Sequence, residues 1–319
     1  MLLIGHRGCS YPGYNQNTIR AFEKVAAEGV PAIEFDVQRC ADGQLVVVHN
    51  RDLEEVSTGR GFVSDTDAAT LKRLYAGDPS RGKDRIPFLP EVFDFFASLS
   101  RENRPAIHME LKGGNTGRSS GELFMEYVAA GTLDTLDLVA SSFNWQELTA
   151  IREICPEARI ALLDGAIRRN RLLEKTGTAA ERYFSQIFSY GNEEYMLPRF
   201  PSLAENLACI DQQCSDPRIR QFLAEETAAC LSGAYYTDEL LDTACAMNAR
   251  SVNLWYQTVS QAFIARAHAR GLAVFVYTVN APDKLRAVTR LGVDGIFTDY
   301  YADAAKLLGT PIHLDHTVL

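Results

Sequence analysis

Short apolar runs rich in β-branched residues alternate with longer amphipathic stretches along most of this 319-residue chain. This alternation is typical of a parallel β-sheet whose strands are connected by helices. Eight runs are predicted as strands: Leu2–Gly5, Ala32–Asp36, Ile107–Lys112, Leu138–Phe143, Arg159–Leu163, Arg250–Trp255, Ala273–Thr278 and Gly295–Thr298. Eight strands with helices between them predict an α/β fold that closes into a (β/α)8 TIM barrel rather than an open sheet.

Two stretches depart from the repeat, but we interpret residues 1–319 as a single barrel domain. Residues 50–90 are polar and rich in turns, and are predicted to be a small insertion. Residues 166–236 separate the fifth and sixth predicted strands and read as several helices with Gly and Pro breaks. Because this larger insertion follows a strand directly, we expect it on the C-terminal face of the barrel, where active sites lie.

Charge and composition limit the partners and the compartment. The net charge of −9 argues against nucleic acid, because duplex binding is dominated by neutralisation of phosphates. No apolar run approaches the ~20 residues needed to span a bilayer, so no transmembrane segment is predicted. If Met1 is the native start, the N-terminus lacks the features of a signal peptide and predicts a cytoplasmic protein. The seven cysteines form no CxxC pair, which fits a reducing compartment.

Charged side chains share one face of the first three predicted strands, because residues two apart lie on the same side of a strand. His6 ends this face in the first strand, Glu34 and Asp36 share it in the second, and Glu110 and Lys112 share it in the third. If these faces point inward, the five side chains meet at the C-terminal rim of the barrel. Three buried carboxylates without partners are very costly, so this arrangement requires a cation.

A β-hairpin is predicted directly after the second strand. Asp42-Gly43 is a strong two-residue turn signal between the apolar segments Val37–Cys40 and Leu45–Val48. With these two residues at the tip, Asp36 lies opposite His49, and a slip of one residue would turn His49 away. The hairpin is therefore expected to return His49 to the level of the carboxylates.

This set of residues suits the cleavage of phosphodiesters. Carboxylate oxygens select a hard cation such as Mg²⁺ or Ca²⁺, which offsets the charge of the phosphate. Histidine can act as the base that activates the nucleophile or as the acid that protonates the leaving oxygen. Arg7 and Lys112 supply fixed positive donors for phosphate oxygens.

The ordered motifs identify a family resemblance that covers nearly the whole chain apart from the larger insertion. The sequence resembles the glycerophosphodiester phosphodiesterase family at His6-Arg7-Gly8, Asn17-Thr18, Glu34-Phe35-Asp36-Val37, Asp42-Gly43, Val48-His49, Glu110-Leu111-Lys112, Ser142-Phe143-Asn144, Tyr277-Thr278-Val279-Asn280, Gly292-Val293-Asp294-Gly295 and Thr298-Asp299. The resemblance implies an acid–base pair of His6 and His49, metal ligands Glu34, Asp36 and Glu110, and phosphate ligands Arg7 and Lys112. It also implies that the segment after His49 is the family's small insertion beside the active site.

Four further residues are interpreted individually. Gln16 stands where the family usually has Glu, and Tyr277 stands where Trp is common. Trp255, at the end of the sixth strand, is predicted either to form a substrate-binding wall or to pack in the core. His108 lies one layer below Glu110 and is predicted to be a hydrogen-bonded residue of the core or of the second shell.

The leading functional hypothesis is hydrolysis of a glycerophosphodiester to sn-glycerol 3-phosphate and an alcohol, assisted by one divalent cation, Mg²⁺ or Ca²⁺. The alternative enzyme is a lysophospholipase D or a phospholipase-C-like barrel that acts on a lipid or inositol headgroup. A catalytically silent barrel that binds a phosphodiester or a protein would lack one of the site residues, and all are present. The alcohol, the order in which the histidines act, a direct or cyclic-phosphate route and the oligomeric state stay open.

Overall fold

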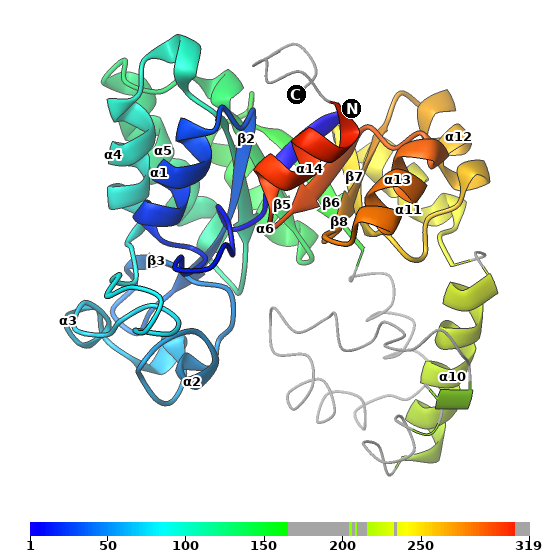
Figure 1. Cartoon of the computed structure of the whole chain (residues 1–319), viewed down its shortest axis with the longest axis horizontal. Helices are drawn as coiled ribbons and strands as arrows, with labels where there is room; N and C mark the ends of the chain where they lie inside the picture. Colours follow the sequence, from blue (N-terminus) through cyan, green and yellow to red (C-terminus); the bar gives the residue numbers. More distant parts are fainter. Residues whose placement is uncertain (165–203, 206–207, 209–215, 233–234, 310–319) are drawn as a thin grey trace.

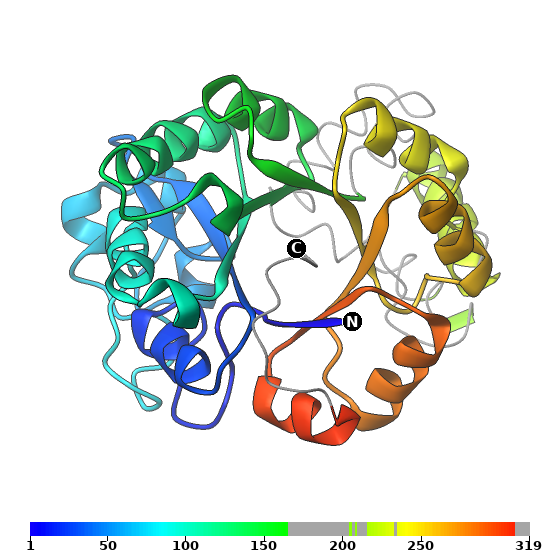
Figure 2. The same ribbon diagram turned by 90° about the horizontal axis from the view of Figure 1, so that it is seen from above.

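The computed structural model describes residues 1–164, 204–205, 208, 216–232 and 235–309. Within these residues, nine strands form one sheet, and β1 pairs with both β2 and β9, so that the sheet closes. All strand pairs are parallel except that between β2 and β3. Eight parallel strands therefore form the closed barrel that Figure 2 shows from above, as the sequence predicts.

The strand positions agree closely with those expected. The strands are β1 (Leu2–Gly5), β2 (Ala32–Arg39), β3 (Leu45–Val47), β4 (Ala106–Leu111), β5 (Leu138–Ser142), β6 (Arg159–Leu163), β7 (Ser251–Trp255), β8 (Ala273–Tyr277) and β9 (Gly295–Thr298). The predicted ends of the eight barrel strands shift by at most one residue, except that β2 continues to Arg39 as an arm of the hairpin.

Helices surround the barrel and cover its outer face (Figures 1 and 2). They are α1 (Ile19–Ala27), α4 (Leu89–Ser98), α5 (Thr116–Ala129), α6 (Trp145–Ile154), α11 (Asp238–Ala246), α12 (Gln261–Ala269), α13 (Pro282–Leu291) and α14 (Tyr301–Leu308). Helix α1 begins after Thr18, whose side chain accepts a hydrogen bond from the backbone N–H of Ala21. Its buried residues include Phe22 and Val25, which pack against the sheet. No helix among the described residues is long and apolar enough to cross a membrane.

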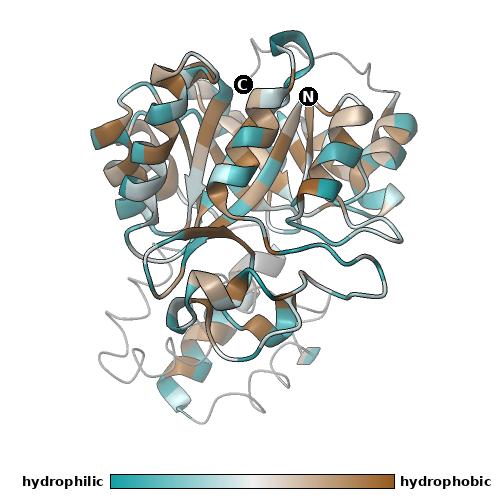
Figure 3. Ribbon diagram, turned by 90° about the vertical axis from the view of Figure 1, so that its left-hand side faces the viewer, coloured by the Kyte–Doolittle hydropathy of each residue, from teal (hydrophilic) through white to brown (hydrophobic). Residues whose placement is uncertain are grey.

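Residues 50–90 form a small unit below the barrel in Figure 3. The unit contains α2 (Leu53–Val56), the 3₁₀ turn η1 (Val63–Asp65) and α3 (Ala68–Leu71). Its core is separate from that of the barrel and includes Cys40, Val46, Val48, Leu53, Val56, Val63, Ala68, Leu71, Ala76, Ile86 and Phe88. Because three of these residues belong to the hairpin or follow it, the unit is anchored directly beside the end of β3.

The larger predicted insertion, residues 166–236, lies mostly outside the described residues. The described part includes α10 (Pro217–Ser232) and the two tyrosines that follow, Tyr235 and Tyr236. Both tyrosines are buried and belong to the main core of the barrel. The expected location of this insertion on the C-terminal face of the barrel stays a prediction.

The register predicted for the hairpin is wrong by one residue. Val37 pairs with Val47, and the backbone N–H of Cys40 donates to the carbonyl of Gln44 (2.9 Å). The loop therefore has three residues and ends at Gly43, whose φ of +84° is accessible mainly to glycine. An Asp-Gly pair fits a two-residue turn and this three-residue loop equally well, so the sequence signal alone did not settle the register.

His49 nevertheless returns to the carboxylates, because the chain leaves strand geometry before it. Strand β3 ends at Val47, and the side-chain amide of Gln38 donates to the backbone carbonyls of Val48 (3.0 Å) and His49 (2.8 Å). This buried amide fixes the main chain at the position where the ladder has ended. Because His49 lies outside the strand, the one-residue difference in register does not turn its side chain away from the carboxylates.

His108 lies inside the barrel, but the expected hydrogen bond is not found. The side chain is fully buried, and neither ring nitrogen has a hydrogen-bond partner among the described residues. Its ring instead packs against Phe275 (centroids 6.0 Å apart) and Phe297 (5.3 Å). Burial, together with the positive charge of Arg159, lowers its pKa to about 3. His108 is therefore a neutral member of an aromatic layer.

This environment predicts a specific contribution to acid sensitivity. The pKa of His108 is about 3 in the native state and 6.5 for the free side chain, so the unfolded chain binds a proton first as the pH falls. The contribution of His108 to the free energy of unfolding is complete above the unfolded pKa. As the pH falls from the unfolded to the native pKa, this contribution is lost by up to about 1.4 kcal/mol per pH unit. When the pH falls from about 7 to about 5, the free energy of unfolding should therefore decrease by about 2 kcal/mol less in His108→Leu than in the parent chain. Urea unfolding in EDTA at both pH values measures this, and identical losses would contradict it.

Candidate active site

A cavity opens at the ends of the strands and brings together most of the predicted site residues. It is lined by His6, Arg7, Glu34, His49, Glu110, Lys112, Ser141, Phe143, Leu163, Asn253, Tyr277, Thr278 and Phe297. These residues come from strands all around the barrel or directly follow them. The predicted convergence at one rim is therefore present in the structure.

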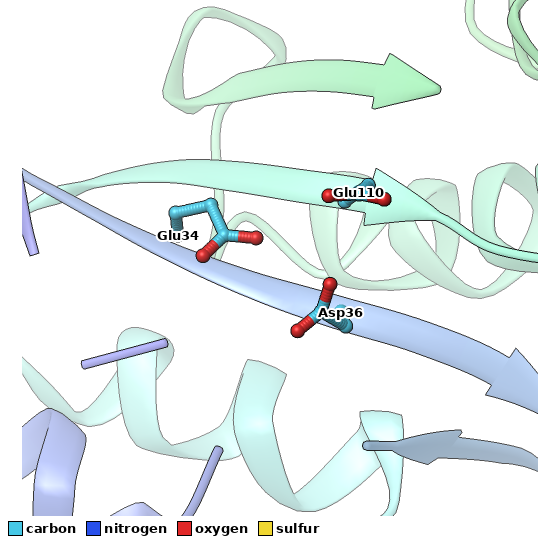
Figure 4. Close-up of side chains that lie close together, drawn as sticks. All are labelled: Glu34, Asp36 and Glu110. Carbon is cyan, nitrogen blue, oxygen red and sulfur yellow. The ribbon is translucent and has the colours of Figure 1, made fainter. Parts of the chain in front are cut away.

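Three carboxylates meet beside this cavity. Glu34 and Asp36 come from β2 and Glu110 from β4, and the two strands pair so that Asp36 lies opposite Glu110. One carboxylate oxygen from each residue lies within 4.8 Å of the others. Figure 4 shows the three side chains gathered on the same side of the two strands. Such a cluster of oxygen donors could hold one divalent cation.

The loop after β1 orients two of the carboxylates. The backbone N–H of Arg7 donates to Glu34 Oε2 (2.8 Å), and the side-chain amide of Asn17 donates to Asp36 Oδ2 (2.8 Å). Arg7 has a φ of +51° and Asn17 a φ of +56°, a region that non-glycine residues adopt infrequently. The contact of Asn17 with Asp36 was not predicted from the sequence.

Two basic side chains offset part of this negative charge. Lys112 Nζ lies 2.7 Å from Glu110 Oε1 and 3.4 Å from Asp36 Oδ1, and the Lys112 side chain is only 3% exposed. Arg7 Nε lies 3.3 Å from Asp36 Oδ2, and its guanidinium donates to Gln16 Oε1 (3.1 Å). Three acids against two fixed bases leave an excess of negative charge in the cluster.

The pKa shifts follow from this arrangement. Burial, and then the negative charges of Asp36 and Glu110, raise the pKa of Glu34 well above its ordinary value. Burial opposes ionisation of Asp36 too, but nearby basic groups hold its pKa below the ordinary value. Burial, and then the charges of Arg7 and Lys112, lower the pKa of His49 well below its ordinary value. Because His49 is thereby neutral, we attribute the lowered pKa of Asp36 to Lys112 and Arg7.

The two histidines reach the same cavity from different directions. His6 follows β1, and its Nε2 lies 4.0 Å from Glu34 Oε2. His49 follows the hairpin, is buried, and contacts the side chain of Asn50 through Nδ1. The structure therefore places both histidines beside the carboxylates.

One contact of His6 was missed by the sequence analysis. His6 Nδ1 lies 2.7 Å from Asp299 Oδ1. Asp299 directly follows β9, so its position at the carboxyl end of the last strand was the signal that could have identified it. The Thr298-Asp299 motif contributes to the family resemblance, but the sequence alone assigns no role to Asp299.

Part of the cavity lining is apolar and aromatic. It contains Phe143, Leu163, Tyr277 and Phe297, and the rings of Phe143 and Tyr277 meet edge to face with centroids 6.3 Å apart. Tyr277 thus lines the pocket. Trp255 is not among the described residues that line the cavity, and its ring packs against that of Tyr256. Its substrate-binding role stays a prediction.

The sequence profile of the glycerophosphoryl diester phosphodiesterase family matches residues 6–196 and 214–302. These ranges cover most of the chain and contain every residue of the site described above. The chain belongs to this family. A glycerophosphodiester phosphodiesterase of Bacillus altitudinis is 31% identical over 313 residues, which cover 96% of this chain and 97% of that relative. One from Caldanaerobacter subterraneus subsp. tengcongensis is 32% identical over 166 residues, 51% of this chain and 66% of that relative.

Solved structures share the fold of this family member. A phosphodiesterase of Oleispira antarctica, in complex with its product sn-glycerol-3-phosphate, has a TM-score of 0.67 at 18% identity, with 97% of each chain covered. A solved structure of a Silicibacter pomeroyi protein has a TM-score of 0.67 at 21% identity, with 97% of this chain and 92% of that chain covered. At these sequence identities the likeness shows that the folds are similar and nothing more.

Proposed function

We propose that this chain hydrolyses glycerophosphodiesters to sn-glycerol 3-phosphate and an alcohol, with Mg²⁺ or Ca²⁺ as cofactor. The observation that carries the proposal is one cavity that is lined by two histidines and lies beside a cluster of three carboxylates. Membership of the family supports the reaction. The product complex of the Oleispira antarctica phosphodiesterase supports the substrate class.

The carboxylate cluster fits a divalent cation by its donors and its charge. Glu34, Asp36 and Glu110 offer oxygen atoms only, which hard cations prefer. Glu34 Oε1 is buried without a hydrogen-bond partner among the described residues, as expected of an atom that serves as a ligand. When bound, a divalent cation supplies positive charge that offsets the phosphate and the charge developing in the transition state.

The basic and acid–base groups have distinct tasks in this proposal. Arg7 and Lys112 line the cavity and donate to phosphate oxygens, which orients the phosphorus atom. One histidine of the pair His6 and His49 removes a proton from the nucleophile, either water or the neighbouring glycerol hydroxyl. The other donates a proton to the leaving oxygen. Detection of a cyclic glycerophosphate would favour the glycerol hydroxyl.

The reaction is tested by the release of glycerol 3-phosphate from glycerophosphocholine and glycerophosphoethanolamine. We expect release with Mg²⁺ or Ca²⁺, none with EDTA, and a loss of about 10²–10⁴-fold in His6→Ala, the usual contribution of an acid–base group. Full activity in EDTA would exclude the role of the cation. Full activity in His6→Ala would exclude the role of that histidine.

The apolar wall favours one second candidate, an activity on lysophospholipids. Phe143, Leu163 and Phe297 offer surface that a glycerophosphodiester with a small polar headgroup does not require. Hydrolysis of lysophospholipid micelles without hydrolysis of glycerophosphocholine would establish this candidate in place of the first.

A further inference from the structure

The clearest feature of the site without an assigned role is the pair formed by His6 and Asp299. Their side chains are mostly buried, at 13% and 19% exposure, and His6 Nδ1 lies 2.7 Å from Asp299 Oδ1. The pair joins the first and last strands of the barrel, where the backbone N–H of His6 also donates to the carbonyl of Thr298 (2.9 Å). Both the backbone and the side chain of His6 are therefore tied to the end of β9.

Asn280 holds the carboxylate of Asp299 in a single orientation. The backbone N–H of Asp299 donates to Asn280 Oδ1 (2.9 Å), which fixes the direction of the Asn280 amide. Asn280 Nδ2 then donates to Asp299 Oδ2 (2.6 Å). Because one carboxylate oxygen is occupied by Asn280, the other, Oδ1, is presented to His6.

The protonation states of this pair are set by the same contacts. Burial opposes ionisation of Asp299, but the hydrogen bond from His6 and that from Asn280 lower its pKa below the ordinary value. An ionised carboxylate can only accept a hydrogen bond, so His6 Nδ1 must carry the proton that it donates. His6 Nε2 is then the nitrogen left for chemistry, and it lies 3.4 Å from Thr278 Oγ1 and 4.0 Å from Glu34 Oε2.

We propose that Asp299, held by Asn280, is a positioning residue that fixes His6 as the tautomer protonated on Nδ1 and presents Nε2 to the substrate. This inference rests on the proposed acid–base function of His6. Asp299 neither contacts the substrate nor changes its own protonation, and the proton that moves in the reaction moves at Nε2. The other histidine is held differently, because His49 Nδ1 contacts the side-chain amide of Asn50 instead of a carboxylate.

The substitution Asp299→Asn distinguishes this role from simple packing. Asn280 Nδ2 requires an acceptor, so the introduced amide must turn its oxygen toward Asn280 and its NH₂ group toward His6 Nδ1. His6 Nδ1 would then accept a hydrogen bond, and the proton would move to Nε2. Asp299→Asn is therefore expected to lower kcat at least as much as Asp299→Ala, although asparagine is nearly isosteric with aspartate. In Asp299→Ala the side chain at position 299 favours neither tautomer of His6.

Kinetics with the full chain and its cation test the consequence for turnover. We expect kcat to fall by roughly 10²–10⁴-fold in Asp299→Asn, with KM and the affinity for Mg²⁺ within about threefold of the parent chain. Asp303→Asn, an exposed carboxylate on α14, is the matched control and should keep full activity. A kcat within threefold of the parent in Asp299→Asn would overturn the proposal. Higher activity in Asp299→Asn than in Asp299→Ala would also overturn the proposal. Asparagine has nearly the shape of aspartate and would restore a role that depends on packing alone.

The tautomer itself is measured without any reaction. Two-bond ¹H–¹⁵N spectra of the histidine-labelled chain, with His6 assigned by comparison with His6→Gln, should show Nδ1 protonated in the parent chain and Nε2 protonated in Asp299→Asn. The same tautomer in both chains would overturn the proposal. If the parent chain hydrolyses no glycerophosphodiester, the proposed function fails, whereas these spectra still test the pairing of His6 with Asp299.

Discussion

Replacing His49 by alanine should lower turnover by about 10²–10⁴-fold while the chain folds and binds its cation normally. The imidazole lines the cavity, but the backbone that carries it is held by Gln38, whose amide bonds the carbonyls of Val48 and His49. These bonds involve no atom of the His49 side chain, so they survive the substitution. The three carboxylates are also retained. We therefore expect a loss of kcat without a comparable loss of stability or of affinity for Mg²⁺.

The measurement is kcat on glycerophosphocholine, together with thermal unfolding with and without Mg²⁺. His268→Ala is the matched control, because His268 lies on α12 with its side chain 42% exposed and pairs with Asp294. This control should keep full activity. A His49→Ala chain that retains activity would contradict both the acid–base assignment and the argument that the hairpin brings this residue into the site.

Replacing Glu34 by glutamine should abolish cation binding without lowering the stability of the cation-free chain. Glu34 is 4% exposed and lies in a cluster of three carboxylates whose oxygens approach within 4.8 Å. In the cation-free chain, burial and the charges of Asp36 and Glu110 already oppose ionisation of Glu34, so a neutral amide fits this position. The amide also keeps an oxygen for the backbone N–H of Arg7, which donates to Glu34 Oε2 in the parent chain. Affinity falls because one of three anionic ligands is gone.

Thermal unfolding with and without the cation separates the effect on cation binding from the effect on the stability of the cation-free chain. At a cation concentration about 100-fold above its Kd, the parent chain should gain about 2.7 kcal/mol of stability, and Glu34→Gln should gain none. Activity should fall with the lost affinity, because the charge that the cation supplies to the transition state is worth several kcal/mol. Glu122→Gln, an exposed carboxylate on α5, is the control and should behave as the parent chain. A Glu34→Gln chain that is still stabilised by Mg²⁺ and Ca²⁺ would remove Glu34 from the ligand set.

The barrel and the carboxylate cluster are predictable from the amino-acid sequence, because both depend on local periodicity. Side chains alternate along a strand, so Glu34 and Asp36 necessarily share a face, as do Glu110 and Lys112. Parallel strands of a closed barrel all present their carboxyl ends at one rim. Once strands and helices alternate, convergence at that rim follows without knowledge of any long-range contact.

The tertiary structure alone decided the features that lie beyond the ends of the strands. Asp42-Gly43 is compatible with more than one loop, and packing selected the register and placed Gln38 to hold His49. His6 meets Asp299 only because β1 and β9 close the barrel, across a sequence separation of 293 residues. His108 lacks the expected partner because Phe275 and Phe297 surround it. Strand periodicity gives the face and depth of a side chain, whereas its partners depend on which distant strands close around it.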